Sequence, residues 1–479
     1  MGSEPLFPLH HRWEVMPLGE VCRRGGGNVQ TGPFGSQLHA SDYVSDGIPS
    51  VMPQNIGDNK ILYTGIAKIT REDAERLSKY RMREGDIVYS RRGDVERRAL
   101  VRKTEDGWLC GTGCLRIRFG DEVVYPRYAA HYLGHPSVRE WIVRHAHGAT
   151  MPNLNTTILS ELPFVLPPWS AQVLIGDAIE AYDRKLDLNR RINQTLEAMA
   201  QAIFQSWFVN FDPVKAKVAA IQEGRDPLRA AMTAVSGKAD AELDALPPEQ
   251  YEQLAATAAL FPDEMEESEV GEVPKGWSVG TLSNFASFQN GYAFKTKDWT
   301  DSGHPVVKIG NVKPGIIDLS GCSLVAHETV NGLDRFALKK GDLLVGMTGY
   351  VGETGLVPAL YSVAYLNQRV GRISTVNGVS DIGYPFCLVR DPAYKAYAES
   401  KAHGSAQANV SGKDLMDYQA VVPDAGVLKI FNAQVAKIIN ALLSYHEENQ
   451  SLAALRDTLL PRLLSGELLV ADAMAEAVA

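Results

Sequence analysis

The chain of 479 residues contains no apolar run as long as the roughly 18 residues needed to cross a membrane. Its first dozen residues also lack a basic start followed by an apolar stretch, which is the pattern of a secretory signal. An apolar fraction of 45% and a charged fraction of 22% are typical of soluble globular proteins. We therefore expect a soluble protein of the cytoplasm that has no membrane partner.

Cysteine is scarce, and no C-x-x-C pair occurs. An odd number of widely spread cysteines disfavours both a disulfide framework and a zinc site, so we expect free thiols, buried or half-buried. His10 and His11 are adjacent but have no matching ligand set, and we expect them in a mobile tail rather than at a metal. The five cysteines are Cys22, Cys110, Cys114, Cys322 and Cys387.

Motifs of catalysis are missing as well. The sequence has no G-x-x-x-x-G-K-S/T phosphate loop, no G-x-S-x-G elbow and no H-E-x-x-H metal motif. Asn210-Phe-Asp-Pro213 is similar to the D/N-P-P-Y/F loop of amino-methyltransferases, but Val214 replaces the second proline and no glycine-rich cofactor loop precedes it. Asp86 and Asp342 follow glycine at loop entries, where carboxylates usually stabilise turns. We therefore expect a non-catalytic chain that binds no metal or cofactor.

The net charge of −9 argues at first against a nucleic-acid partner, because phosphates are bound mainly by Lys and Arg. The charge is unevenly distributed, however. Residues 240–272 hold eleven acidic residues and no Lys or Arg, and without them the balance is −9 + 11 = +2. Residues 71–118 contain thirteen Lys or Arg against nine Asp or Glu. This segment favours either a phosphate-binding surface or a solvated surface without a ligand.

The second half of the chain follows the first at a nearly constant offset of 256 residues. Over Asp42–Asn55 and Asp298–Asn311, five positions are identical without a gap. At the same offset lie Gly85-Asp86 with Gly341-Asp342, Arg116-Ile117 with Arg372-Ile373, Ala146-His-Gly148 with Ala402-His-Gly404, and Asn153 with Asn409. A fixed period of this kind indicates a duplicated structural unit.

Each repeat is roughly 150 residues long, which is the usual size of a domain with its own core. Short β-rich runs, such as Asp86–Ser90 and Asp342–Val345, alternate with Gly, Asp and Pro in a pattern of hairpins and loops. We therefore expect an α+β protein with two similar mixed domains and a pseudo-two-fold internal repeat. The predicted segments are a first domain (1–166), a central helix (167–211), an acidic linker or helical insert (212–272), a second domain (273–424), a C-terminal helix (425–470) and a tail (471–479).

Two long helices are predicted from apolar residues that recur at alternating spacings of three and four, which is the coiled-coil period. Equivalent asparagines, Asn193 and Asn449, fall on both seams, where a buried Asn can fix the register. We expect the helices to pack antiparallel on each other, with a kink or an end at Pro461. The alternative is that each helix packs only on its own domain. The predicted packing residues are Ile179, Tyr182, Leu186, Asn193, Leu196, Trp207, Leu442, Tyr445, Asn449 and Leu452.

Several segments resemble the specificity subunits of type I restriction-modification systems. They are the openings Trp13-Glu-Val-x-x-Leu-Gly and Pro274-Lys-Gly-Trp277, the proline signals Pro167-Pro168 and Pro423, Ala202–Pro213, and Leu459–Leu468. The similarity covers nearly the whole chain. The chain departs from the pattern after Pro167-Pro168, where the acidic residue expected before Gln172 is missing, and in the enlarged 212–272 segment.

The resemblance implies two target-recognition domains that each read half of a bipartite site in double-stranded DNA, with the helices setting the spacer. It also implies two modification (methyltransferase) subunits as partners, together with restriction (translocase and endonuclease) subunits. S-adenosylmethionine, ATP and Mg would then be bound by those partners and not by this chain.

Base reading requires Arg, Lys, Asn or Gln in a groove, while phosphates are also bound by Ser, Thr and Tyr. Because Arg91 and Arg92 correspond to Met347 and Thr348, these positions should carry distinct specificity. Asparagines that occur in both halves suit scaffold roles better. The candidate DNA-binding residues are Gln37, Gln54, Asn55, Arg91, Arg92 and Asn153 in the first domain, and Tyr292, Lys295, Lys308, Asn311, Thr348, Tyr350, Gln407 and Asn409 in the second.

Two other functions remain open at this stage. One is a protein-interaction scaffold, whose repeated domains bind proteins and whose acidic insert recruits a basic partner. The other is a modification methyltransferase with fused recognition domains, which the missing motifs disfavour. Salt-sensitive binding to duplex DNA would favour DNA recognition over the scaffold.

Overall fold

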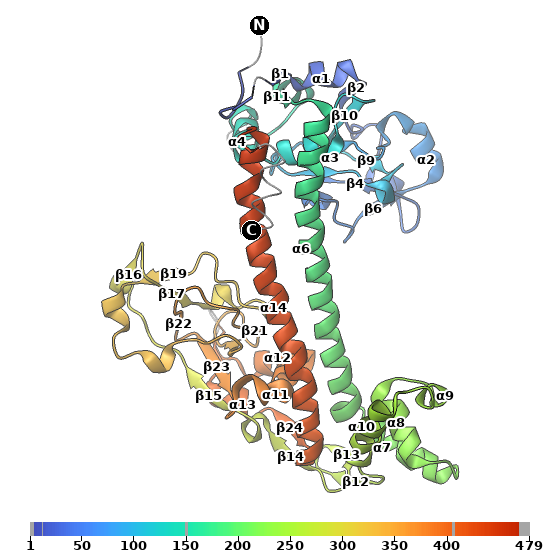
Figure 1. Ribbon diagram of the computed structural model, residues 1–479, viewed down its shortest axis with the longest axis vertical. Helices are drawn as coiled ribbons and strands as arrows, with labels where there is room; N and C mark the ends of the chain where they lie inside the picture. Colours follow the sequence, from blue (N-terminus) through green and yellow to red (C-terminus); the bar gives the residue numbers. More distant parts are fainter. Residues whose placement is uncertain (1–3, 12, 149–151, 405–407, 469–479) are drawn as a thin grey trace. The chain divides into compact units, whose positions relative to one another are not determined.

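The computed structural model describes residues 4–11, 13–148, 152–404 and 408–468. The chain divides into two compact units, of which unit 1 comprises Met1–Asp187 and Ser451–Ala479 and unit 2 comprises Leu188–Gln450 (Figure 1). Each unit therefore contains parts of both long helices. The segment boundaries given above stay predictions, and the bounds below are those of the structure.

Unit 1 is built on a five-stranded sheet with the order β2-β10-β7-β8-β5 and a four-stranded sheet with the order β3-β6-β4-β9. A third pair, β1 with β11, joins the start of the domain to its end. The strands are β1 (Glu14–Pro17), β2 (Gly26–Thr31), β3 (Tyr43–Val44), β4 (Ile48–Val51), β5 (Asp58–Asn59), β6 (Ala67–Ile69), β7 (Ile87–Ser90), β8 (Arg98–Leu100), β9 (Leu109–Cys110), β10 (Cys114–Gly120) and β11 (Pro163–Leu166). The helices are α1 (Leu18–Arg24), α2 (Arg71–Arg76), α3 (Pro126–Tyr132), α4 (Pro136–His145) and α5 (Thr156–Glu161).

Unit 2 has sheets of the same sizes, with the orders β15-β23-β20-β21-β18 and β16-β19-β17-β22, and the pair β14 with β24. The strands are β14 (Ser278–Thr281), β15 (Ser287–Asn290), β16 (Trp299–Thr300), β17 (His304–Val307), β18 (Gly315–Ile316), β19 (Ser323–Val325), β20 (Leu343–Gly346), β21 (Thr354–Leu356), β22 (Tyr365–Leu366), β23 (Val370–Ser374) and β24 (Gln419–Val422). The helices are α11 (Gly383–Arg390), α12 (Pro392–Lys401) and α13 (Gly412–Met416).

The two units repeat each other in strand register as well as in strand order. In unit 1, Leu115 on β10 pairs with Tyr89 on β7, and in unit 2 Gly371 on β23 pairs with Val345 on β20. Both residues of the second pair lie 256 positions after those of the first. The predicted α+β fold with an internal repeat is therefore confirmed.

The two long helices are α6 (Trp169–Phe204), which continues as a π-helical turn over Gln205–Val209, and α14 (Ala425–Leu464). α6 begins directly after Pro167-Pro168, as expected for residues that are disfavoured in a helix interior. Pro461 lies inside α14, so the helix does not end there but three residues later. By length and composition alone α14 is apolar enough to span a membrane. Several of its apolar residues, however, belong to the buried cores of the two units, among them Phe431, Leu442 and Leu464.

Side-chain contacts show that α6 and α14 run antiparallel. In unit 2, Asn193 Nδ2 donates to the carbonyl oxygen of Leu442 at 3.2 Å, and Asn189 Nδ2 donates to Asn449 Oδ1 at 3.0 Å. Residues later in α6 therefore contact residues earlier in α14. The prediction that the helices pack on each other is confirmed, although both also pack into the domains' cores.

The predicted packing residues differ in burial. Buried residues are Ile179, Leu186, Trp207 and Leu442, while Tyr182, Asn193, Leu196, Tyr445, Asn449 and Leu452 are half-buried. Asn189 is 0% exposed, which makes it the more deeply buried partner of the asparagine pair. The seam is therefore apolar at the domains and polar around residue 189.

The acidic segment after α6, predicted as a linker or a helical insert, folds into four helices. Ala231, Met232, Leu243 and Ala258 form a small apolar core of its own, and the acidic side chains remain on the outside. The helices are α7 (Asp212–Gln222), α8 (Pro227–Ser236), α9 (Asp240–Leu243) and α10 (Pro248–Ala259), followed by the hairpin of β12 (Met265–Ser268) and β13 (Gly271–Pro274).

The N-terminal segment differs from its predicted role as a mobile tail. Leu6, Phe7 and Leu9 pack against the core of unit 1. The backbone N–H of His10 donates to the carbonyl oxygen of Ser465 at 2.8 Å. The apolar residues before His10 and His11 thus hold this segment against unit 1. The prediction of a mobile tail considered the histidines and did not consider these apolar residues. The five cysteines are free and buried or half-buried, as predicted.

Candidate nucleic-acid interface

The buried polar scaffold is the same in both units. Arg116 on β10 is 3% exposed and donates from NH2 to Gln30 Oε1 at 2.8 Å. In unit 2, Arg372 on β23 donates from NH2 to Oε1 of Gln289. Arg116 NH1 also donates to the carbonyl oxygen of Arg81 at 2.9 Å. Arg372 NH1 donates in the same way to the carbonyl oxygen of Ala337, which lies 256 positions after Arg81. The residues that are identical in the two halves thus build the domain.

Residues at the ends of the strands in unit 1 form a cluster of loops that we call loop surface 1. It comprises segments 32–37, 52–54, 91–93, 111–113 and 152–154. The N–H of Arg91 donates to the carbonyl oxygen of Gly113 at 2.8 Å, and the N–H of Gly93 donates to that of Pro152 at 3.1 Å. A Cβ added to Gly113 would lie 3.2 Å from Pro53 Cγ, so the loop of residues 52–54 lies against Gly113. Backbone bonds therefore hold loops from distant parts of the sequence together.

Loop surface 1 contains five of the six candidate residues of the first domain. Gln54 and Arg92 are exposed, Arg91 and Asn153 are half-buried, and Gln37 Oε1 accepts from Tyr80 Oη at 2.7 Å. Arg92 and Asn153 form a β-bridge between two of the loops.

Asn55 is the exception among these candidates. Its side chain is 0% exposed, Oδ1 accepts from the N–H of Met52 at 3.1 Å, and Nδ2 donates to the carbonyl oxygen of Leu62 at 3.2 Å. Because both ends of the amide stabilise this turn, we remove Asn55 from the candidate contact set.

Unit 2 has the corresponding loop surface 2, formed by segments 291–294, 308–310, 347–350, 367–369 and 408–410. The N–H of Met347 donates to the carbonyl oxygen of Arg369 at 3.0 Å, and the N–H of Val410 donates to that of Met347 at 2.9 Å. The N–H of Gln368 donates to the carbonyl oxygen of Tyr292 at 2.9 Å. The architecture of loop surface 1 is therefore repeated with other side chains.

The candidates of the second domain occupy several different environments. Tyr350 is 64% exposed, and Lys295 and Asn409 are also exposed. Lys308 Nζ lies 3.6 Å from the ring centroid of Trp299 and donates to Ser323 Oγ at 2.7 Å. Burial lowers the pKa of the Lys308 ammonium.

Three other candidates have structural partners. Thr348 is 8% exposed and donates to Asn409 Oδ1 at 2.7 Å. Tyr292 packs in an aromatic cluster with Phe294 and Phe336. Asn311 accepts from the N–H of Lys308 at 3.0 Å and thus repeats the turn of Asn55. Gln407 lies outside the described residues.

Three exposed residues of the loop surfaces escaped the candidate set. They are Phe34, which is 54% exposed, and the adjacent pair Gln368 and Arg369. Gln368 and Arg369 lie 256 positions after Thr112 and Gly113. Comparison of the repeats position by position would have revealed this basic residue, because a glycine in one half stands opposite an arginine in the other.

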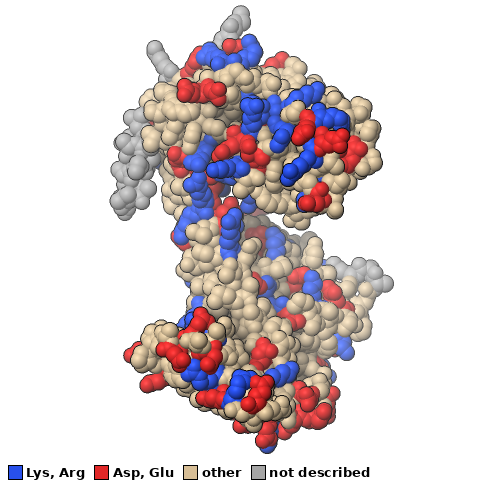
Figure 2. Space-filling view, turned by 90° about the vertical axis from the view of Figure 1, so that its right-hand side faces the viewer, with Lys and Arg blue, Asp and Glu red and all other residues tan. Residues whose placement is uncertain are grey.

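The basic surplus of segment 71–118 is only partly available to a ligand. Arg98 and Arg116 are buried, and Arg76 and Arg97 form ion pairs with neighbouring aspartates. The remaining exposed basic side chains include Arg92. On the face of unit 1 that Figure 2 shows, Lys and Arg gather in several groups with acidic side chains between them. Exposed cations are thus present, though fewer than the composition suggests.

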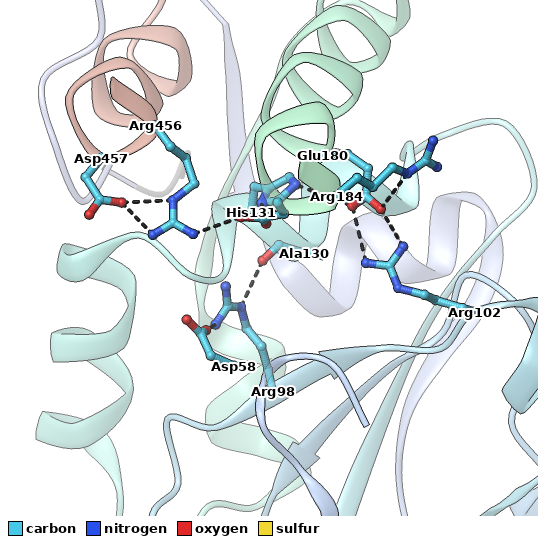
Figure 3. Close-up of polar contacts among 10 residues, drawn as sticks. Asp58, Arg98, Arg102, Ala130, His131, Glu180, Arg184, Arg456 and Asp457 are labelled. Atoms are coloured by element: carbon cyan, nitrogen blue, oxygen red, sulfur yellow. Dashed lines mark hydrogen bonds and ion pairs between the residues drawn. The ribbon is translucent and has the colours of Figure 1, made fainter. Parts of the chain in front are cut away.

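A buried ionic network fixes α6 to the first domain. Glu180 on α6 is 2% exposed and accepts from Arg102 NH1 at 2.5 Å and from Arg184 Nε at 3.3 Å (Figure 3). Burial opposes ionisation of Glu180, but the hydrogen bond and charge of Arg102 outweigh it and hold the pKa of Glu180 below its ordinary value.

His131 on α3 extends this network toward α14. Its Nε2 lies 4.0 Å from Glu180 Oε2 and its Nδ1 lies 4.0 Å from Asp183 Oδ2, while Asp183 accepts from Arg456 NH1 of α14 at 2.8 Å. Burial lowers the pKa of His131 to about 4, although the neighbouring carboxylates oppose this effect. The imidazole is therefore neutral at pH 7.

The same position in unit 2 is apolar. Residues 256 further along replace His131 by Cys387, Glu180 by Ala436 and Asp183 by Ile439. Cys387 and Ile439 are fully buried in one core with Ala200. Ala200 lies 256 positions before Arg456 and is therefore the counterpart of that arginine in the other repeat. At this position the first domain thus contacts the helices through charged groups and the second through apolar packing.

Within the described ranges, no group of three or more His, Cys, Asp or Glu side chains is placed to hold a metal ion. Asp86 serves the scaffold, since its carboxylate accepts from the N–H of Arg83 and from the guanidinium of Arg118. The arrangement of both units is that of two rigid scaffolds that display variable loops.

Comparison with known proteins agrees with this architecture. Residues 11–198 and 274–453 match the model of the type I restriction modification DNA specificity domain. The chain is 30% identical over 440 residues to the type I restriction enzyme HindI specificity subunit of Haemophilus influenzae, a match that covers 88% of this chain and 95% of that protein.

A second relative is the type I restriction enzyme MjaIX specificity subunit of Methanocaldococcus jannaschii, which is 19% identical over 96% of this chain and 94% of its own length. The crystal structure of an S subunit from M. genitalium superimposes with a TM-score of 0.52 at 14% identity, covering 96% of this chain and 99% of that one. This likeness concerns the fold. Because the family model matches both repeats and the HindI relative spans most of the chain, the protein belongs to the family of type I restriction-modification DNA specificity subunits.

Proposed function

We propose that this chain recognises a bipartite site in double-stranded DNA, that each unit reads one half-site, and that the chain itself catalyses no reaction. One observation supports the proposal above all: the two units share a buried scaffold but differ in the side chains of their loop surfaces. A duplicated domain with one common ligand would be expected to repeat its contact residues as well. Different loops on equal scaffolds fit two different half-sites.

The chemistry of the loop surfaces agrees with DNA reading. The exposed or half-buried side chains include Gln54, Arg91 and Arg92 in unit 1 and Gln368 and Arg369 in unit 2. Arg, Lys and Gln donate to base edges in the major groove or to phosphates. Held on backbone bonds between loops, such side chains lose little further freedom on binding.

α6 and α14 are proposed to set the spacer between the half-sites and to dock two modification subunits. Large apolar side chains are exposed on both helices outside their mutual seam. Side chains exposed on the helices in this way are available for contact with a partner subunit. They are Trp169, Leu174, Leu188 and Met199 on α6 and Leu455 on α14.

Catalysis is assigned to the partners. S-adenosylmethionine would be bound by the modification subunits, and ATP and Mg by the restriction subunits, in the cytoplasm where the DNA lies. The scaffold alternative receives no support from the comparisons. A fused methyltransferase would need a cofactor motif that this sequence lacks.

The test is single-molecule methylome sequencing of cells that express the chain with its modification subunit, compared with cells that lack only this chain. A bipartite adenine-methylated motif that depends on the chain is the expected result. If all methylation persists without the chain, the proposal is wrong. Salt-dependent binding of the purified complex to duplex DNA gives an independent measurement.

A further inference from the structure

The two loop surfaces exchange the position of an arginine. In unit 1 the N–H of Arg91 donates to the carbonyl oxygen of Gly113, and in unit 2 the N–H of Met347 donates to that of Arg369. Met347 and Arg369 lie 256 positions after Arg91 and Gly113. The two positions are therefore neighbours in each unit, and the arginine occupies the first position in unit 1 and the second in unit 2.

Backbone hydrogen bonds on both sides hold Arg91 at its position. Its N–H is held by Gly113, and its carbonyl oxygen accepts from the N–H of Leu154 at 2.8 Å. The guanidinium carbon lies 5.9 Å from the ring centroid of Phe34, which is itself 54% exposed. A cation–π contact at this distance orients the guanidinium, whose Nε is buried while the residue as a whole is half-buried.

The backbone of Arg369 is also held by hydrogen bonds, but to different residues. Its N–H donates to Oδ1 of Asn367 at 3.3 Å, its carbonyl oxygen accepts from Met347, and Asn367 is 5% exposed. The side chain of Arg369 is exposed. The buried asparagine thus fixes the backbone while the guanidinium faces outward.

A scaffold role does not explain this exchange. At the sheet, a scaffold arginine keeps its position in both units, as Arg116 and Arg372 do, whereas the arginine of the loop surfaces changes position. Met347 and Gly113 offer no side-chain hydrogen bond, so each unit has one strong donor at this junction. An arginine fork matches the O6 and N7 acceptors of guanine, and this pairing discriminates against the other bases.

We propose that Arg91 and Arg369 are the principal base-reading residues, and that each recognises a guanine in the half-site read by its own unit. The inference rests on the proposed function and deepens it. Since the arginines come from different loops, the two guanines are read from different positions of otherwise equivalent domains.

The first test is methylome sequencing with the variants Arg91→Gln and Arg369→Gln. Each variant should relax or change one guanine position in one half-site and leave the other half-site unchanged. Discrimination at that position should fall on the order of 10- to 100-fold. Arg23→Gln and Arg225→Gln, which remove an exposed charge elsewhere in each unit, should keep the wild-type motif.

The second test uses DNA duplexes that carry the wild-type motif, with 7-deazaguanine at the assigned position. This base lacks the N7 acceptor, so methylation by the wild-type complex should slow while that of the R369Q complex should not slow further. The same comparison applies to R91Q. R369K keeps the charge but loses the fork. It should therefore methylate DNA with the relaxed motif even if R369Q binds too weakly.

The outcomes separate this inference from the proposed function. A wild-type chain that yields no motif overturns both. A wild-type motif that R91Q and R369Q leave unchanged overturns only the inference. So does an R369K variant that retains the full wild-type discrimination, because the side chain would then act as a point charge on phosphate.

Discussion

Asn189 on α6 donates a hydrogen bond of 3.0 Å from its side-chain amide to Oδ1 of Asn449 on α14. It also donates to Glu448 Oε2 at 2.9 Å. Asn189 is fully buried, and the residues around it on the seam are apolar or half-buried. A polar pair in an apolar seam favours one register, because any shift of the helices would bury the amides without partners.

We predict that Asn189→Leu alone lowers the free energy of unfolding by about 1–3 kcal/mol, because it leaves Asn449 without its donor. The double variant N189L/N449L should recover part or all of this loss, since both polar groups are then removed. Urea unfolding of the full chain measures both. Losses of N189L and N449L that simply add up in the double variant would show that the amides do not act as a pair.

Stability should also depend on pH through His131. Its pKa in the folded protein is about 4 against 6.5 ordinarily, so between these values the unfolded chain binds more protons than the folded one. Folding stability contributed by the neutral imidazole is complete above pH 6.5 and is lost as the pH falls toward 4. The facing groups Glu180 and Asp183 reduce this effect but do not cancel it.

The variants H131C and H131Q remove this titration, and the first copies the residue found in unit 2. Whatever their stability at pH 7, both should gain about 1–2 kcal/mol relative to the wild type between pH 7 and pH 5. Denaturant unfolding at the two pH values measures the difference. A pH dependence equal to that of the wild type in both variants would contradict the assignment.

Asn55 and Asn311 should matter for stability and not for sequence recognition. Alanine at either position leaves backbone groups of the turn without partners, so the free energy of unfolding should fall by about 1–3 kcal/mol. The methylated motif should be unchanged. Gln54→Ala, an exposed neighbour, should change stability by less than about 0.5 kcal/mol. A changed half-site in N55A or N311A would return these residues to the contact set.

A matched insertion tests whether α6 and α14 set the spacer. One heptad added between Asp187 and Leu188 and a second added between Gln450 and Ser451 should lengthen both helices by about 10 Å and keep the seam in register. The spacer in the methylated motif should grow by roughly 3 base pairs, with both half-sites unchanged. An insertion in α6 alone should reduce activity, since the Asp183–Arg456 contact and the Asn189–Asn449 contact could then no longer form together. An unchanged spacer in the matched variant would disprove the ruler.

Much of the fold followed from one regularity, the constant offset of 256. Strand positions such as Ile87–Ser90 and Leu343–Gly346 and the start of α6 agree with the expectations from alternation and proline signals. The offset also separated residues common to both halves from residues that differ. This is why Asn55 and Asn311 were suspected as scaffold and Arg91 as reader, although contact with DNA stays a prediction for every candidate.

Other features depend on contacts between distant segments, and a count of residue types does not show them. The position of Arg369 is defined by backbone bonds to Met347, and residue type alone did not single it out. Burial depends on the tertiary structure, so the sequence alone did not show which arginines of segment 71–118 are exposed to a ligand. The helical fold of the acidic segment rests on a small core that includes Met232 and Leu243, which a charge count does not reveal.

The path of α14 has a consequence for the order in which this protein can fold. α14 begins in unit 2, yet its last residues, Leu463 and Leu464, together with Leu468, are buried in the core of unit 1. The ribosome adds these leucines only after every strand of both domains has been made. The apolar core of the first domain can therefore be completed only after the strands of both domains have been synthesised.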